Sequence, residues 1–169
     1  FRLYLSLYDG VSKLEIGTEP GFEFVPEAAG KRAAPVVMYG TSILQGGCVS
    51  RPGMAFTNIL GRWLDREVVN LGFSGNALLD PEIAQLMGRV ENPAVYVLDN
   101  VPNDTPEIIL ERGEKFVKIL REAHPDVPVV FVENPFFPHA IEDEKTDNDI
   151  KENNAPLRSL YEKMKKEGQ

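Results

Sequence analysis

Apolar runs alternate with helical patterns over most of the chain, from Pro35 onward. Four short apolar runs are typical of buried strands, and they lie at residues 36–39, 68–71, 94–98 and 129–132. Apolar residues then recur at three- and four-residue spacing, which predicts helices near residues 56–64, 81–90, 105–120 and 157–164. This alternation favours an α/β fold, with a parallel sheet covered by helices on both faces.

Residues 1–26 follow a different pattern, in which apolar and polar positions alternate with a period of two. The alternation runs over residues 1–8 and resumes at 14–16, with the turn signal Asp9-Gly10 between the two runs. This pattern predicts a β-hairpin. The hairpin is either an edge decoration of the following domain or, as we prefer, the end of an all-β domain.

We therefore expect three parts. Residues 1–27 belong to the all-β part, residues 28–34 form a linker, and residues 35–169 form the α/β domain. The chain opens at Phe1 with neither an initiator Met nor a signal sequence, so we expect it to be part of a longer protein.

Composition and charge narrow the classes of partner. The chain has 26 acidic and 18 basic side chains, a net charge of −8, and no basic stripe, which makes nucleic acid and anionic membranes poor partners. No apolar run approaches the roughly 18–20 residues of a membrane-spanning helix. Cys48 is the single cysteine, so neither an internal disulfide nor a zinc site of several thiolates can form.

One segment is strongly acidic. Residues 141–155 carry six acidic side chains and no aromatic residue, and Asp147 and Asp149 could bind a hard cation. The segment lacks the glycine and the terminal glutamate of a calcium loop, so we interpret it as a solvated loop. We expect no metal and no cofactor.

Three loops rich in Gly, Asn, Ser and Asp follow the first three predicted strands, at residues 40–43, 70–76 and 99–104. Ligands bind beyond the carboxyl ends of the strands in open parallel sheets, and these loops should share that edge. Turn geometry and local capping would explain each loop alone. Together they indicate a functional site.

The segments 40–43, 70–75 and 101–104 resemble, in order and spacing, the first three blocks of the SGNH (GDSL-like) hydrolases. Residues 40–54, and 48–54 in particular, resemble a bacterial branch in which a β-sandwich domain precedes the hydrolase, which would account for the hairpin. The resemblance covers roughly residues 1–135. It departs from the usual pattern at Thr41, where many members have Asp, and at Val101, where Gly is common.

The resemblance implies a three-layer α/β/α, flavodoxin-like fold and ester hydrolysis through an acyl-enzyme, without a cofactor. It implies that Ser42 is the nucleophile and that the oxyanion donors are the backbone N–H groups of Ser42 and Gly75 and the side-chain amide of Asn103. The substrates would be small acyl esters, and the family resemblance suggests acetylated carbohydrate among them. The family also suggests a periplasmic or secreted protein, and the oligomeric state stays open.

A serine nucleophile needs a general base, which the family supplies as Asp-x-x-His after a fifth strand. Neither histidine fits, because Arg121 stands three residues before His124 and Phe136 three before His139. We expect the base to lie outside these residues and this chain alone to be inactive. We interpret His124 as a helix-end residue and His139 as a loop residue toward the active-site edge.

Three further residues have competing interpretations. Arg51 could clamp an anionic or hydroxylated substrate or could hold its own loop. Cys48 is expected to be small and buried, and Trp63 to lie in the core. The leading alternative to an esterase is a non-catalytic carbohydrate-binding or scaffold module of the same fold. A mononucleotide binder is disfavoured, because Gly40 lies too far from the predicted helix at 56 to form a phosphate loop.

Overall fold

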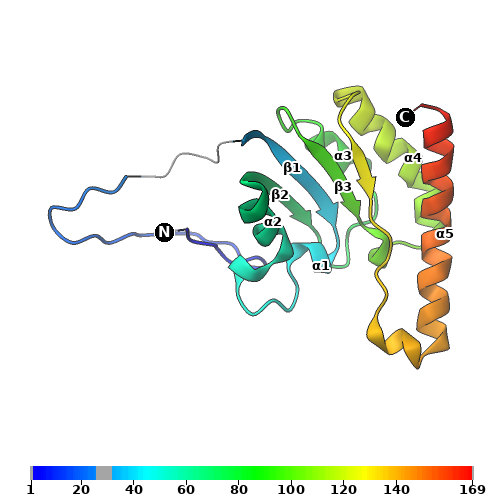
Figure 1. Cartoon of the computed structure of the whole chain (residues 1–169), viewed down its shortest axis with the longest axis horizontal. Coiled ribbons are helices and arrows are strands. Elements are labelled where there is room, and N and C mark those ends of the chain that lie inside the picture. The colour runs from blue at the N-terminus through cyan, green and yellow to red at the C-terminus, as the bar shows by residue number, and fades with distance from the viewer. Residues whose placement is uncertain (1, 26–31, 169) are drawn as a thin grey trace.

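The computed structural model describes residues 2–25 and 32–168, and its centre is a four-stranded parallel sheet (Figure 1). The strands are β1 (Arg32–Gly40), β2 (Arg66–Gly72), β3 (Val95–Asp99) and β4 (Val129–Phe131). Their order is β2-β1-β3-β4, and every neighbouring pair is parallel. This is the start of the 2-1-3-4-5 order of flavodoxin-like folds, so the predicted α/β class is confirmed.

Five α-helices and three short 3₁₀ helices connect and cover the described strands. The α-helices are α1 (Ser42–Gln45), α2 (Phe56–Leu64), α3 (Pro81–Met87), α4 (Pro106–Ala123) and α5 (Glu144–Lys166). The 3₁₀ helices are η1 (Pro52–Met54), η2 (Val101–Asn103) and η3 (Pro138–Ile141). All four helices predicted from the apolar spacing are present, whereas α1, at four residues, is too short to show a helical period.

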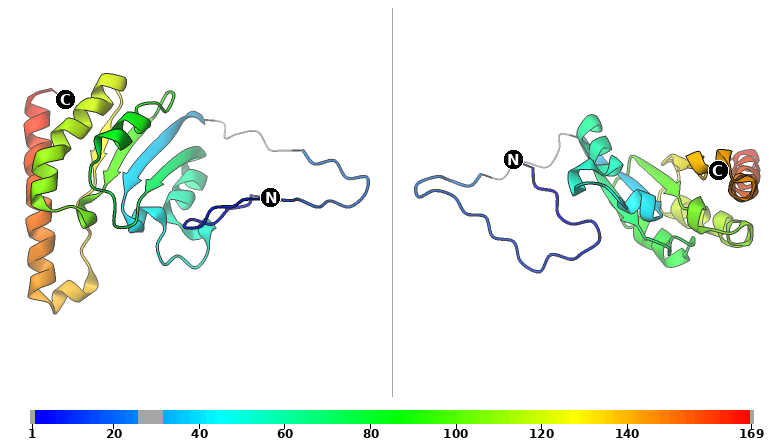
Figure 2. Two further views of the ribbon diagram at one scale, coloured as in Figure 1. Left: turned by 180° about the vertical axis from the view of Figure 1, so that it is seen from behind. Right: turned by 90° about the horizontal axis from the view of Figure 1, so that it is seen from below.

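Residues of β1 alternate between two cores, one on each face of the sheet. Val37 and Tyr39 pack with α3, α4 and the apolar side of α5, while Val36 and Met38 pack with Leu44 of α1 and with α2. Figure 2 shows α2 on one face of the sheet and α3 and α4 on the other. The sheet is therefore the middle layer of three, and the connecting loops lie at the ends of its strands.

The prediction that Trp63 lies in the core is wrong, because its side chain is 79% exposed. On α2 the buried Thr57 and the packed Leu60 define the face that meets the sheet. At 3.6 residues per turn, Trp63 lies about 90° round the helix from the centre of that face. The apolar arc of α2 is wider than the surface that the sheet covers.

The acidic segment is helical from Glu144 onward, so the predicted loop at 141–155 is wrong. The carboxylate of Asp143 caps the helix by accepting a hydrogen bond from the N–H of Lys145. Ion pairs then join Lys145 to Asp149 and Lys151 to Asp147, each at 2.6 Å and four residues apart. Such pairs support a helix without an apolar period. Both candidate cation ligands thus have lysine partners, and no group of three or more potential metal ligands occurs in the described ranges.

The described part of the predicted hairpin, residues 2–25, forms no strand. Leu3, Leu5, Leu14 and Ile16 remain largely exposed, and a two-stranded hairpin is marginal without a surface to cover one face. Phe1 and most of the expected linker lie outside the described residues, and β1 begins at Arg32, before the expected domain start at Pro35. Over the described part of the chain, no helix combines the length and apolar character needed to cross a bilayer.

Candidate active site

The three loops leave the sheet side by side at the carboxyl edge. Gly40, the last residue of β1, is in register with Gly72 on β2 and with Asp99 on β3. Just beyond the strands, the N–H of Phe73 donates to the carbonyl of Gly40 at 2.8 Å, and the N–H of Thr41 donates to the carbonyl of Asp99 at 3.2 Å. The predicted convergence of these loops on one edge is therefore present.

Glycine is required at two points where these loops meet. A Cβ atom on Gly40 would lie 2.5 Å from the carbonyl oxygen of Asp99. A Cβ atom on Gly72 would lie 2.3 Å from the backbone nitrogen of Gln45 in α1. Real Cβ atoms do not approach backbone this closely, so any side chain here would separate α1 from the second loop.

Ser42 is the first residue of α1 and is half-buried. Thr41 caps the helix through its hydroxyl oxygen, which accepts from the N–H of Ile43 at 3.3 Å. The N–H of Ser42 has no acceptor within the helix, as expected for a first helical residue. Its hydroxyl has no hydrogen-bond partner among the residues that the structure describes. Both groups are thus available to a ligand.

Gly75 and Asn103 are in contact across the second and third loops. Gly75 has φ +71°, which opens the turn that presents successive N–H groups. With its amide oxygen facing that turn, Asn103 accepts from the N–H groups of Gly75 and Asn76 at 3.1 Å and of Ala77 at 3.3 Å. The opposite amide orientation gives a single bond, from Nδ2 to the carbonyl of Phe73 at 3.3 Å. The first orientation satisfies more groups, and we adopt it.

Gln45 ties three segments together at this edge. Its Oε1 accepts from the N–H of Ser74 at 2.9 Å, and its Nε2 donates to the carbonyl of Leu7 at 3.2 Å. In the same N-terminal segment, the Tyr8 hydroxyl donates to the carbonyl of Ser42 at 3.4 Å. Sequence reasoning missed Gln45, Leu7 and Tyr8, because no local pattern indicates contacts between positions 29 to 38 residues apart.

Two buried carboxyl groups lie in the third loop. Burial raises the pKa of Asp99 to about 6. Burial also raises the pKa of Asp104 to about 7, against the lowering effects of a hydrogen bond from Asn100 and the charge of Arg112. The second oxygen of Asp104 and the Oδ1 of Asn100 are both buried without a partner in the described structure. Burial of a carboxyl oxygen without a donor suits a protonated, uncharged Asp104.

The remaining candidates lie apart from this cluster. Arg51 is exposed at the start of η1. His124 ends α4 and its Nε2 lies 3.1 Å from the carbonyl of Gly88; it precedes β4 and so lies toward the amino edge of the sheet, opposite the loops. The backbone of His139 is in η3, and its side chain is outside the described residues. Cys48 is exposed rather than buried, in a backbone conformation with φ +62°.

Known proteins of one family are similar to this chain. Residues 33–169 match the model of the GDSL-like lipase/acylhydrolase family. No curated protein matched the chain. Among solved structures, a protein from Bacteroides ovatus described as a GDSL-like lipase is 32% identical over 84% of this chain, with a TM-score of 0.78.

Two more distant structures share the fold. The salicylyl-acyltransferase SsfX3 of a tetracycline biosynthetic pathway is 22% identical over 79% of the chain, with a TM-score of 0.65. A family two carbohydrate esterase from Cellvibrio japonicus is 14% identical over 87%, with a TM-score of 0.61. The chain spans 41%, 40% and 52% of the lengths of these three proteins. The family match and the arrangement of the three loops lead to one conclusion: the chain belongs to the GDSL-like lipase/acylhydrolase family.

Proposed function

We propose that this protein is a serine esterase that cleaves small acyl esters through an acyl-enzyme on Ser42. The oxyanion of the tetrahedral intermediate would accept hydrogen bonds from the N–H groups of Ser42 and Gly75 and from the side-chain amide of Asn103. Preorganised donors of this kind are commonly the largest single contribution to acyl-transfer catalysis.

The observation that carries the proposal is the contact between Asn103 and the N–H of Gly75, at 3.1 Å, beside the loop that begins α1. The N–H of Gly75 and the side-chain amide of Asn103 come from different loops and are brought together by this bond, in which the Asn103 oxygen accepts. The third proposed donor belongs to Ser42, whose loop is hydrogen-bonded to both of the others through Gly40 and Thr41. Turn geometry within any single loop does not require this meeting.

The contact also suggests how the site responds to substrate. Without a ligand, the Gly75 N–H donates to Oδ1 of Asn103. An oxyanion would share that N–H, while Nδ2 of Asn103 would supply a further donor. Because the amide is held by two other N–H groups, those of Asn76 and Ala77, it can keep its orientation while the Gly75 N–H is shared.

The proposal assigns the general base to residues outside this chain. His124 cannot serve, since its ring is engaged with Gly88 at the far edge of the sheet. We propose that an Asp-x-x-His segment of a longer protein approaches Ser42 from the carboxyl edge and takes the proton of its hydroxyl. For the substrate we propose an acetylated carbohydrate; the shared fold of the Cellvibrio japonicus carbohydrate esterase is consistent with this choice.

The test is ester hydrolysis by the longest natural protein that contains these 169 residues. Release of acetate from acetylated xylan and of p-nitrophenol from its acetate and butyrate esters would be compared among the wild type, Ser42→Ala and Ser50→Ala. Ser50 is an exposed serine on the same segment and serves as the matched control. We expect Ser42→Ala to abolish turnover and Ser50→Ala to retain it. Undiminished hydrolysis by Ser42→Ala would reject the nucleophile, and a wild type inactive on all esters would favour the non-catalytic module.

A further inference from the structure

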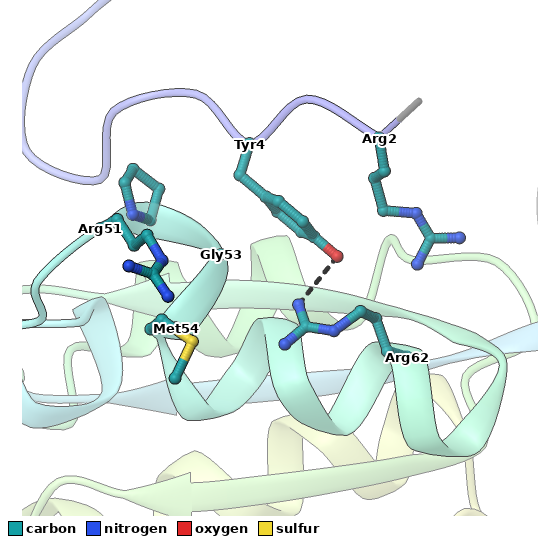
Figure 3. A pocket seen from close by; sticks show the side chains of 7 residues that line it. Arg2, Tyr4, Arg51, Gly53, Met54 and Arg62 are labelled. Atoms are coloured by element: carbon teal, nitrogen blue, oxygen red, sulfur yellow. Dashed lines mark hydrogen bonds between the residues drawn. The ribbon is translucent and has the colours of Figure 1, made fainter.

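A pocket of about 540 Å³ lies between the N-terminal segment, η1 and α2 (Figure 3). Three arginine side chains and Tyr4 surround it, and residues 52–54 form one wall. The arginines come from three separate parts of the chain. Arg2 is on the N-terminal segment, Arg51 precedes η1, and Arg62 is on α2.

The charge of this pocket is opposite to that of the chain. The whole chain carries −8, yet no acidic side chain is among the described residues that line the pocket. Asp65 and Glu67 line a neighbouring groove that also includes Arg2 and Tyr4, and in the described structure neither forms an ion pair with Arg51 or Arg62. The guanidinium groups of Arg51 and Arg62 carry like charges, and an anion bound between them would relieve their repulsion.

Tyr4 holds Arg62 in place for such a ligand. Nη1 of Arg62 donates to the Tyr4 hydroxyl at 2.9 Å, and its guanidinium carbon lies 5.3 Å from the centre of the ring. Burial acts to raise the pKa of Tyr4, but the hydrogen bonds and charges of Arg62 and Arg2 leave it below the ordinary value. Gly53 allows this packing, because a Cβ atom there would lie 2.9 Å from the Tyr4 ring.

Arg51 supplies the free donors. Its side chain is exposed and does not cap η1. Within residues 2–25 and 32–168, its guanidinium has no hydrogen-bond or ion-pair partner, which argues against the alternative that it holds its own loop. A guanidinium presents five N–H donors in a planar fork that matches a carboxylate or a phosphate.

We infer that this pocket binds an organic oxyanion, a carboxylate or a phosphate, between Arg51 and Arg62. The apolar body of the ligand would lie against Pro52, Met54 and the ring of Tyr4. The N-terminal segment that carries Tyr4 also contacts α1, because the Tyr8 hydroxyl donates to the backbone carbonyl of Ser42. Binding here does not require that Ser42 be a nucleophile.

The experiment is isothermal titration at constant ionic strength with three probes: galacturonate, its neutral counterpart galactose, and inorganic phosphate. It uses the longest natural protein that contains the chain. We expect saturable binding of at least one anion and none of galactose. Arg51→Gln and Arg62→Gln should each weaken the anion at least about tenfold, because each removes charge-assisted hydrogen bonds. The matched control is Arg89→Gln, which removes one exposed arginine elsewhere and should leave the affinity unchanged.

Tyr4→Phe tests the arrangement without removing charge. It keeps the ring against Gly53 but removes the acceptor for Arg62, so we expect several-fold weaker binding with unchanged unfolding in urea. Saturation by phosphate alone would assign a phosphate ligand, and saturation by galacturonate alone a carboxylate. The inference is overturned if neither anion saturates the wild type, or if Arg89→Gln weakens binding as much as Arg51→Gln.

Discussion

Replacing Asn103 by aspartate separates the catalytic and structural roles of this side chain. Oδ1 of Asn103 accepts from three backbone N–H groups, at 3.1, 3.1 and 3.3 Å, and the aspartate of Asn103→Asp would keep an oxygen in that position. The substitution removes Nδ2, the proposed oxyanion donor, and puts a negative charge where the oxyanion forms. Loss of one such donor costs about 2.7–4 kcal/mol of transition-state stabilisation, so kcat should fall by at least about 10²-fold.

Stability should respond in the opposite sense to activity. A carboxylate accepting three N–H groups forms charge-assisted bonds, which are stronger than the neutral ones that they replace. We expect the free energy of unfolding of Asn103→Asp to equal or exceed that of the wild type. Asn103→Ala leaves these N–H groups without their acceptor and should lose about 1–3 kcal/mol. Urea unfolding at about pH 6 suits the comparison, because Asp104, with a pKa of about 7, is then mostly protonated.

Two results would refute this reasoning. If Asn103→Asp retained hydrolysis within a few-fold of the wild type, the side-chain amide would not be an oxyanion donor. If Asn103→Asp were destabilised as much as Asn103→Ala, the side-chain oxygen would not be held by the N–H groups of Gly75, Asn76 and Ala77. The informative comparison is between the change in kcat and the change in the free energy of unfolding. A substitution that merely damages the fold lowers both together.

Three further predictions concern the support of the site. Gly72→Ala should lower the free energy of unfolding, measured in urea, by about 3 kcal/mol, because its Cβ would lie 2.3 Å from the Gln45 backbone nitrogen. The control is Gly17→Ala, where the Cβ would lie in open space, and the same free energy should change by less than about 0.5 kcal/mol. Burial raises the pKa of Asp104 from 3.8 to about 7 and that of Asp99 to about 6, so the protonated form of each favours folding and wild-type stability should fall as pH rises from about 4 to 7. The share of Asp104 is on the order of 4 kcal/mol, and Asp104→Asn should remove that share in denaturation curves measured across this range. Gln45→Ala should lower kcat about tenfold with little change in KM, and Gln45→Glu, which keeps the acceptor for Ser74, should lose less.

The parallel sheet could be predicted because its strands are buried on both faces and therefore read as apolar runs. The same reasoning placed the loops of Ser42, Gly75 and Asn103 on one edge, since parallel strands share their carboxyl ends. The family resemblance, now confirmed over residues 33–169, supplied the proposed role of each residue. Those roles remain proposals.

The errors have identifiable physical causes. A period of two predicts a strand only where another strand is available to pair, and residues 2–25 have none in the described structure. The start of α5 was missed because lysine–aspartate pairs and a cap, rather than an apolar stripe, support it. Trp63 was assigned to the core because the period marks an apolar arc but not how much of that arc a neighbour covers.

Contacts between distant segments were beyond the reach of local patterns. Gln45 reaches Leu7 across 38 positions and Ser74 across 29, and the pairing of Tyr4 with Arg62 spans 58. The contacts of Leu7 and Tyr4 depend on how the N-terminal segment lies against α1 and α2, and that of Ser74 on how α1 meets the loop after β2. No spacing rule encodes either arrangement. The sequence indicated Arg51 as a candidate binding residue. It could not indicate the pocket around Arg51, because the lining residues come from separate segments of the chain.

The most direct test of a nucleophilic Ser42 is covalent labelling with an organophosphonate ester, followed by peptide mass spectrometry. It would use the longest natural protein that contains this chain. The account predicts a single adduct, on the peptide containing Ser42, that disappears in Ser42→Ala and forms more slowly in Asn103→Asp. An unlabelled protein, or an adduct on another serine, would contradict it.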